Sequence, residues 1–213
     1  MNNSKLVELY LHEQLKIGQA FPVTKVAGFI SFILKTYDSG GTIYLAANGG
    51  NAGLCDNFCA DLLFHPFVSD DKTKPVPAHV KRTKVVNLTA SPSVITAAMN
   101  DFGPNHIFSA QLEGRIGPED LFIGVSGSGN SPNILEALKT AKSCGALTAA
   151  ITRGSGGKCR ELAELTIVIP GTSTFPGQTG GNDNNFHFED CFCSISHMAV
   201  GILQKLVREE YQL

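Results

Sequence analysis

The sequence predicts an α/β fold with a parallel sheet that is covered by helices on both faces. Short continuous apolar runs alternate with helical patterns along the chain. Strands that are buried on both faces of a parallel sheet have such continuous apolar sequences. In addition, two glycine-rich turns each follow an apolar run and precede a helix, as in βα units. A chain of 213 residues is long enough to bury a full core.

The elements follow from local patterns along the chain. Residues 4–36 carry apolar residues at helical spacing, and Pro22 divides this stretch into two helices. We therefore expect an N-terminal helical arm, residues 1–38, that packs on the main domain, 39–213, or on a neighbouring subunit. The expected strands are 42–47, 83–88, 121–125, 147–152 and 165–169. The expected helices are 52–64, 93–99, 106–113, 132–144, 157–164 and 186–210, with a loop at 171–185.

Composition and charge exclude several classes of protein. The net charge is −2 and no segment carries a basic stripe, so direct binding of nucleic acid is not expected. No apolar run approaches the roughly 20 residues of a membrane span, and the N-terminus lacks a signal-peptide pattern. Six cysteines without a CxxC pair indicate reduced thiols that serve as small core residues. We expect a cytoplasmic protein with no membrane contact.

The serine-rich turn at 126–131 is the strongest functional signal. It lies between the end of an expected strand, Val125, and Pro132, which suits the first turn of a helix. Unpaired N–H groups at a helix N-terminus favour an anion, and parallel sheets bind ligands at this edge. The alternative is an ordinary N-cap at Ser131, and neither Walker A nor GxGxxG is present. The expected phosphate or sugar contacts here are Ser126, Gly127, Ser128, Asn130 and Ser131.

A second turn has the same strand–turn–helix context. It reads Asn48-Gly49-Gly50-Asn51 and follows the expected strand 42–47. Its backbone and amide side chains are expected to contact the sugar hydroxyls or the phosphate, while the alternative is a plain glycine turn. Two such turns at one sheet edge predict a site for a sugar phosphate.

These turns resemble those of the sugar isomerase (SIS) domain family. The Gly-Asn-Gly-Gly-Ser-Ala turn of the family appears as 47–52, its Ser-Thr-Ser-Gly-Asn-Ser-Pro-Asn turn as 126–133, and its Asn-Asp-Tyr/Phe-Gly…Phe-Ser segment as 100–103 and 108–109. The resemblance covers residues 5–208 and is greatest to the phosphoheptose isomerase branch and to its relative that binds the replication initiator DnaA. It implies a flavodoxin-like three-layer αβα sandwich and a homotetramer with active sites between subunits.

The resemblance also implies catalytic residues. The Glu of the branch falls on Asp61, its His on His197, and its Gln on Glu189. In this chain Glu189, Cys193 and His197 share one helix face, since they are four residues apart. If the helices carrying Asp61 and His197 meet at the sugar, Asp61 is the expected base, His197 the acid, and Glu189 a group that orients His197 or binds a metal.

Zinc is the cofactor that the resemblance leaves open. Asp61, Glu189 and His197, with His65 as a further candidate, are residue types that suit zinc or manganese. Three departures from the family pattern bear on the substrate and the reaction: Asp61 is one methylene shorter than the Glu of the family, Asn57 replaces a His and is a poor zinc ligand, and Ser91 replaces an Asp.

Two other residues of the last expected helix, His187 and Cys193, are considered as members of the site. His187 opens this helix beside the loop and is a further candidate for the site, like His65. Cys193 is interpreted as a packing residue, with a nucleophile as the alternative.

These expectations point to two kinds of function. The first is a phosphosugar isomerase that interconverts an aldose and a ketose phosphate, with sedoheptulose 7-phosphate as the named candidate. The alternative is a non-catalytic SIS-domain protein that binds a phosphosugar or the initiator DnaA as a regulator. Turnover of a sugar phosphate distinguishes them.

Overall fold

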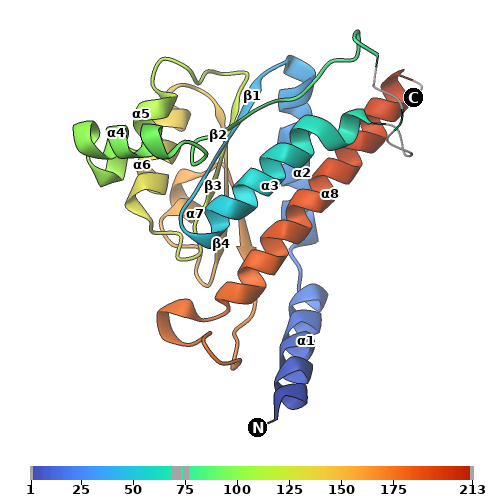
Figure 1. Ribbon diagram of the computed structural model, residues 1–213, viewed down its shortest axis with the longest axis vertical. Helices are drawn as coiled ribbons and strands as arrows, with labels where there is room; N and C mark the ends of the chain where they lie inside the picture. The colour runs from blue at the N-terminus through green and yellow to red at the C-terminus, as the bar shows by residue number, and fades with distance from the viewer. Residues whose placement is uncertain (1, 69–72, 74–76, 212–213) are drawn as a thin grey trace.

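A five-stranded parallel sheet forms the centre of the molecule (Figure 1). The computed structural model describes residues 2–68, 73 and 77–211. All four strand pairings are parallel, which confirms the predicted sheet. The strand order is β2-β1-β3-β4-β5, with β1 Thr42–Ala47, β2 Lys84–Asn87, β3 Leu121–Val125, β4 Leu147–Arg153 and β5 Leu165–Ile169.

Most helices lie where the sequence predicts them. The α-helices are α1 Asn3–Gln19, α2 Val23–Ser39, α3 Gly50–Phe64, α4 Pro92–Phe102, α5 Ser109–Leu112, α6 Pro132–Ser143, α7 Cys159–Leu162 and α8 Asn185–Tyr211. The 3₁₀ segments are η1 His65–Phe67, η2 Pro104–His106 and η3 Gly180–Asn182.

Two predicted helices are much shorter than expected. The expected helix 157–164 is reduced to the single turn of α7, because Gly154, Gly156 and Gly157 all have positive φ and form a turn before it. The expected helix 106–113 is reduced to α5, which begins after η2 and ends before Gly114, another residue with positive φ.

Alternate residues of the three central strands, β1, β3 and β4, enter two separate cores. Ile43 and Leu45 of β1 belong to the core beneath α2, α3 and α8, whereas Tyr44 and Ala46 belong to the core beneath α4, α5, α6 and α7. This is the period of two that a β-strand imposes. The helices accordingly form one layer on each side of the sheet (Figure 1), which confirms the three-layer sandwich.

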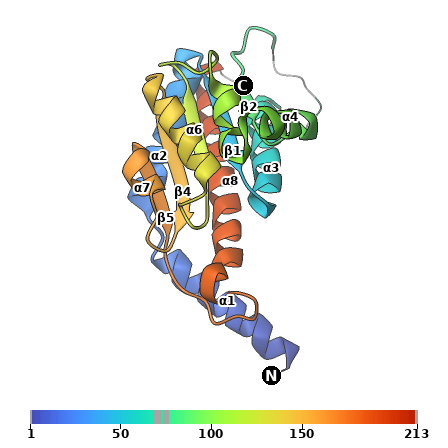
Figure 2. The ribbon, with the colours of Figure 1, turned by 90° about the vertical axis from the view of Figure 1, so that its left-hand side faces the viewer.

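The predicted arm, 1–38, is divided by the structure. Helix α2 belongs to a layer of the sandwich, since Phe29 and Ile33 are fully buried in the core. Helix α1 is bent by 74° from α2 and lies beyond the sandwich, beside the loop before α8 and the first turns of α8, in both views (Figure 1 and Figure 2). The sequence pattern shows where a helix forms but not which partner it packs on.

Within the part of the chain that the structure describes, no single helix is long and apolar enough to cross a membrane. Among the described helices, α1 and α2 taken together as a bent pair are the only ones that meet the criteria of length and composition.

All six cysteines are free thiols. Three of them are buried, and burial raises the pKa of Cys55 to about 12 and that of Cys159 and Cys191 to about 11. These three are therefore small core residues, as the sequence predicts.

Helix α1 is attached to the rest of the molecule through a buried carboxylate. Glu13 accepts hydrogen bonds from Ser173 and Thr174 in the segment between β5 and α8. Burial raises the pKa of Glu13, but these hydrogen bonds and that of His187 outweigh burial and lower the pKa to about 2.

We predict that this carboxylate makes stability depend on pH. A pKa that is lower in the folded state contributes stability above the unfolded value, 4.5, and this contribution is lost as the pH falls toward 2. The free energy of unfolding should therefore be lower in Glu13→Gln than in the wild type at pH 7, and the difference should shrink below pH 4.5. Denaturant titrations at several pH values measure the difference in the free energy of unfolding between the two proteins. A difference that stays constant from pH 7 to pH 3 contradicts the prediction.

Candidate active site

Both predicted turns lie at the carboxyl edge of the sheet, at its topological switch point. The chain passes from β1 to β2 on one side and from β3 to β4 and β5 on the other, and ligands of open α/β sheets bind where the order reverses. The turn 48–51 follows β1, and the turn 126–131 follows β3. Asn48 and Asn133 join them by two reciprocal amide hydrogen bonds of 3.0 and 2.8 Å.

The serine turn continues the backbone ladder before it opens. Ser126 N donates to Ile151 O at 3.0 Å, and Arg153 N donates to Gly127 O at 3.1 Å. Gly129 N then closes a tight turn onto Ser126 O at 2.9 Å. The hydroxyls of Ser126 and Ser131 lie 2.9 Å apart. The two ends of the turn are thereby held together at the start of α6.

Three amides of this turn are available to a ligand. Among the described residues, the N–H groups of Gly127, Ser128 and Ser131 have no acceptor. They precede the first turn of α6, where backbone donors and the helix dipole favour an anion. Asn130 has a different role, since its side chain donates to Ser128 O and accepts from Lys158 N. It braces the turn.

Glycine is required at position 129 by a close backbone contact. Its φ is +65°, and a Cβ there would lie 2.0 Å from the carbonyl oxygen of Gly156. A Cβ on Gly157 would in turn lie 2.6 Å from Gly129. The turn after β3 thus packs backbone to backbone against the turn after β4, and this contact holds the three free amides in place.

We predict that Gly129→Ala destabilises the protein by roughly 2–3 kcal/mol, because it adds both overlap and backbone strain. Thermal unfolding measures the loss, and calorimetry should show weaker binding of a sugar phosphate. Gly53→Ala is the matched control, since no atom lies within 4 Å of its Cβ position in α3. The free energy of unfolding of this variant should rise by about 0.5–1 kcal/mol. Equal stability of the two variants would contradict the contact.

The N–H groups of Gly127, Ser128 and Ser131 are called the cradle below. Arg153 lies beside the cradle, and the sequence analysis did not identify it. Its Nη1 and Nη2 donate to Asp183 O and Gly181 O at 2.5 and 2.7 Å. Its Nε is buried without an acceptor among the described residues and lies 3.2 Å from the Cβ position of Gly127. Arg153 ends the strand next to β3, so the carboxyl-edge rule, applied to this strand as well, would have identified it.

Glu189 also lies at the switch point. Its Oε1 is 3.3 Å from the Cβ position of Gly50 and accepts from Asn185 Nδ2 at 3.0 Å. Asn185 Oδ1 is itself 3.3 Å from the Cβ position of Gly127. Asn51, the last residue of the first turn, is buried, and its Oδ1 has no partner among the described residues. The first turns of α3 and α8 therefore bring several polar groups to the two turns.

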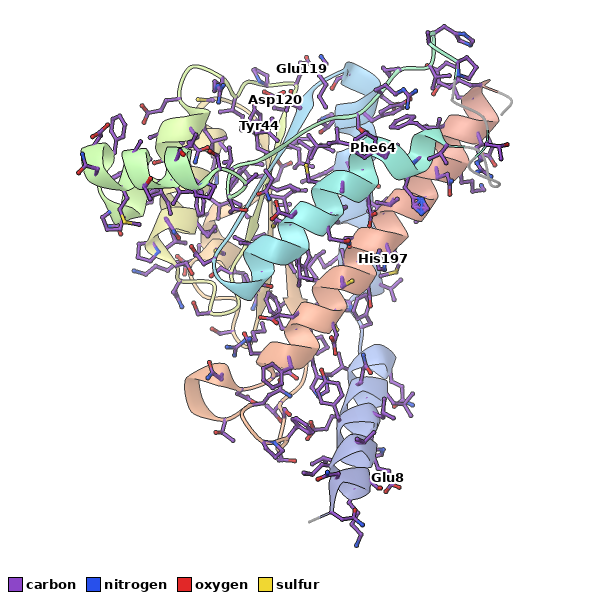
Figure 3. All side chains as sticks on the ribbon, in the orientation of Figure 1. Glu8, Tyr44, Phe64, Glu119, Asp120 and His197 are labelled. Carbon is purple, nitrogen blue, oxygen red and sulfur yellow. The ribbon has the colours of Figure 1, made fainter. Side chains whose placement is uncertain are left out.

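The other two predicted catalytic residues form a pair on neighbouring helices. His197 Nε2 of α8 lies 3.8 Å from Asp61 Oδ2 of α3, and Figure 3 shows His197 midway along α8. Asn57 donates to the same Asp61 oxygen at 3.2 Å, and Cys193 Sγ is 3.8 Å from His197 Nε2. The pair opens on a groove of about 300 Å³ that is lined by Asn57, Asp61, His65, His197, Val200, Gly201 and Gln204.

The three expected zinc ligands are not brought together in one chain. Asp61 and His197 are adjacent, but Glu189 is eight residues before His197, which is about 12 Å along a helix. Across the described ranges, no group of three or more His, Cys, Asp or Glu residues could hold a metal ion. A single chain therefore does not fit zinc, and Glu189 does not orient His197.

His187, the further candidate on this helix, lies away from the two turns. It is fully buried, and its Nε2 lies 3.2 Å from Glu13 Oε2 of α1. The first turns of α8 thus point Glu189 toward the switch point and His187 toward α1, because the two residues lie on different sides of the helix.

Taken together, the fold and the site define an α/β protein with a turn of three unpaired amides at the switch point of a parallel sheet and an Asp–His pair on two adjacent helices. The model of the SIS domain family matches residues 13–153, which is more than half of the chain. The chain therefore belongs to the SIS domain family, and the resemblance seen in the two turns is confirmed.

Curated relatives match most of the chain. It is 32% identical over 182 residues to a phosphoheptose isomerase from Chlorobaculum parvum, covering 85% of this chain and 78% of that protein. It is 30% identical over 203 residues to a phosphoheptose isomerase from Aquifex aeolicus, covering 95% and 89%.

Solved structures share the fold. A phosphoheptose isomerase from Neisseria gonorrhoeae superimposes with a TM-score of 0.78 at 22% identity, covering 96% of this chain and 100% of that one. One from Francisella tularensis has a TM-score of 0.76 at 21% identity, with the same coverage. At these levels of sequence identity, the structural similarity establishes a shared fold only.

Proposed function

We propose that this chain is a phosphosugar isomerase of the phosphoheptose isomerase type, with sedoheptulose 7-phosphate as its substrate. The observation that carries the proposal is the Asp61–His197 pair, 3.8 Å apart, in a chain that also has an anion cradle with unpaired amides. Relatives at 30–32% identity bear the name phosphoheptose isomerase, and their names support a seven-carbon sugar phosphate, a class to which sedoheptulose 7-phosphate belongs.

The chemistry requires two proton transfers, one between carbons and one between oxygens. In the ketose-to-aldose direction, Asp61 removes a proton from C1 to form an enediolate and then returns it to C2. His197 gives a proton to the carbonyl oxygen at C2 and takes one from the hydroxyl at C1. The unpaired amides of the serine turn hold the phosphate, which fixes the position of the reacting carbons.

We predict that Asp61→Asn and His197→Ala each reduce kcat for sedoheptulose 7-phosphate by about 10²–10⁴, the range of general acid–base catalysis. Both variants should retain the circular dichroism spectrum and the affinity for the sugar phosphate. Asp56→Asn, on the same helix but outside the groove, is the matched control and should keep wild-type turnover.

The same assay decides between the two functions. Full activity in either variant would remove the role given to that residue. A wild type that binds the sugar phosphate without converting it would favour the alternative, a non-catalytic phosphosugar-binding or DnaA-binding regulator. Asn57 supports this alternative, since an amide replaces the imidazole of the family and binds metals poorly.

We further propose that the active site is completed between copies of this chain, in a homotetramer. Glu189 at the switch point and His197 at the groove are about 12 Å apart along α8. A cradle from one copy with the Asp61–His197 pair from another would bring these parts together. Phe64, Met198 and Ile202, adjacent in sequence to groove residues, are 66%, 39% and 44% exposed, and exposed apolar patches often mark interfaces.

We predict that Ile202→Glu lowers the mass measured by light scattering, because a charge would be buried at the contact, and that activity falls with it. Lys205→Gln is the control on the same helix: Lys205 is largely exposed and makes a surface ion pair with Glu209, which contributes little. A wild type that is monomeric at micromolar concentration, or an unchanged mass in Ile202→Glu, would contradict this assembly.

The six free thiols support a location in the reducing cytoplasm.

A further inference from the structure

A single carboxylate on α1 binds two other parts of the molecule. Glu13 is 8% exposed, and buried carboxylates are rare unless they are paired. Its Oε2 accepts from Ser173 Oγ at 2.6 Å and lies 3.2 Å from His187 Nε2 of α8. Its Oε1 accepts from Thr174 N at 2.8 Å and from Thr174 Oγ1 at 2.9 Å. Every bond runs to a residue at least 160 positions away.

Tyr10 repeats the attachment one turn earlier on the same face of α1. Its hydroxyl donates to Asp190 Oδ2 at 2.5 Å. Its ring lies 4.1 Å, centroid to centroid, from the ring of His187 and 5.0 Å from that of Phe175. Helix α1 therefore contacts both the loop before α8 and the first turns of α8.

A buried glutamine transmits this attachment to the start of α8. Gln178 has no exposed surface, and its Nε2 donates to Ser173 Oγ at 3.0 Å. Its Oε1 accepts from Phe186 N at 2.5 Å and lies 3.4 Å from His187 N, so it satisfies amides that a helix N-terminus leaves open. The chain of contacts Glu13–Ser173–Gln178 thus ends at the first turn of α8.

The same loop and helix start hold the polar groups of the switch point. The carbonyls of Gly181 and Asp183 fix the guanidinium of Arg153. The first turns of α8 carry Asn185 and Glu189, which lie against Gly127 and Gly50 of the two turns. A displacement of the loop would therefore move several groups at the cradle together.

We propose that Glu13 is a positioning residue for the phosphate cradle: through Ser173 and Gln178 it sets the loop and the first turn of α8 against the two turns. The inference rests on the proposed function and extends it to α1, which carries no residue of the site. Helix α1 is then part of the binding apparatus. A purely stabilising role for Glu13 is the competing interpretation, and the two differ in what happens to substrate affinity in the folded protein.

The experiment compares Glu13→Gln with Glu8→Gln, a matched change on the exposed part of the same helix (Figure 3). Steady-state kinetics with sedoheptulose 7-phosphate are measured where circular dichroism shows both variants to be folded. We expect KM to rise roughly tenfold in Glu13→Gln, which corresponds to a loss of about 1.4 kcal/mol of binding free energy. The kcat should stay nearly constant, because the lost interaction is made equally before and during reaction. Glu8→Gln should match the wild type.

Ser173→Ala removes the link while leaving the carboxylate in place. It should reproduce the rise in KM, and the double variant should be no worse than either single one, since residues of one network are not additive. Hydrogen exchange at 178–187 should be faster in both variants. An unchanged KM in folded Glu13→Gln and Ser173→Ala would overturn the inference.

The inference and the proposed function fail separately. A wild type that binds sedoheptulose 7-phosphate without turnover refutes the isomerase, and the inference is then judged by the dissociation constant in the same variants. A wild type that neither binds nor converts it refutes the proposed function, and the exchange rates at 178–187 decide the role of Glu13. Unchanged exchange rates would overturn it.

Discussion

The reversal of strand order between β1 and β3 is the constraint on which the site depends. Because the chain leaves these adjacent strands in opposite directions, their following turns share one edge without a helix between them. The amide pair of Asn48 and Asn133 then joins the turns, and the backbone contact of Gly129 with Gly156 holds the second turn open. The cradle is thus formed by main-chain geometry, and the side chains around it adjust its charge.

Local patterns were sufficient to predict most of the fold. Continuous apolar runs located all five strands, and their alternation with helices predicted a parallel sheet. The helices in the segments 106–113 and 157–164 are shorter than predicted, since left-handed glycines such as Gly114 and Gly157 interrupt the backbone and their φ values are not visible in an apolar pattern. Helix α2 was assigned to the arm because a periodicity of 3.6 identifies a buried face but not its partner.

The site was predictable where it is local and not where it is tertiary. The serine turn and the pairing of Asp61 with His197 follow from turn chemistry and from the family resemblance. Within one chain Glu189 does not orient His197 or share a metal site with it. Positions eight residues apart share a helix face, but they are separated by about 12 Å along the helix axis. Arg153 was missed since its contact with the cradle arises from the pairing of β3 with β4. His187 could be rejected as a candidate only once the packed structure showed that α1 covers it.

The choice of donors in the cradle has a consequence for selectivity. In the proposed function, three main-chain N–H groups would bind the phosphate by hydrogen bonds more than by net charge, since both terminal nitrogens of Arg153 are occupied by carbonyls. Binding of this kind would depend little on ionic strength, because screening weakens the attraction between full charges far more than it weakens short hydrogen bonds. The number of acceptor oxygens, and not the charge alone, would then distinguish a phosphoryl group from a carboxylate.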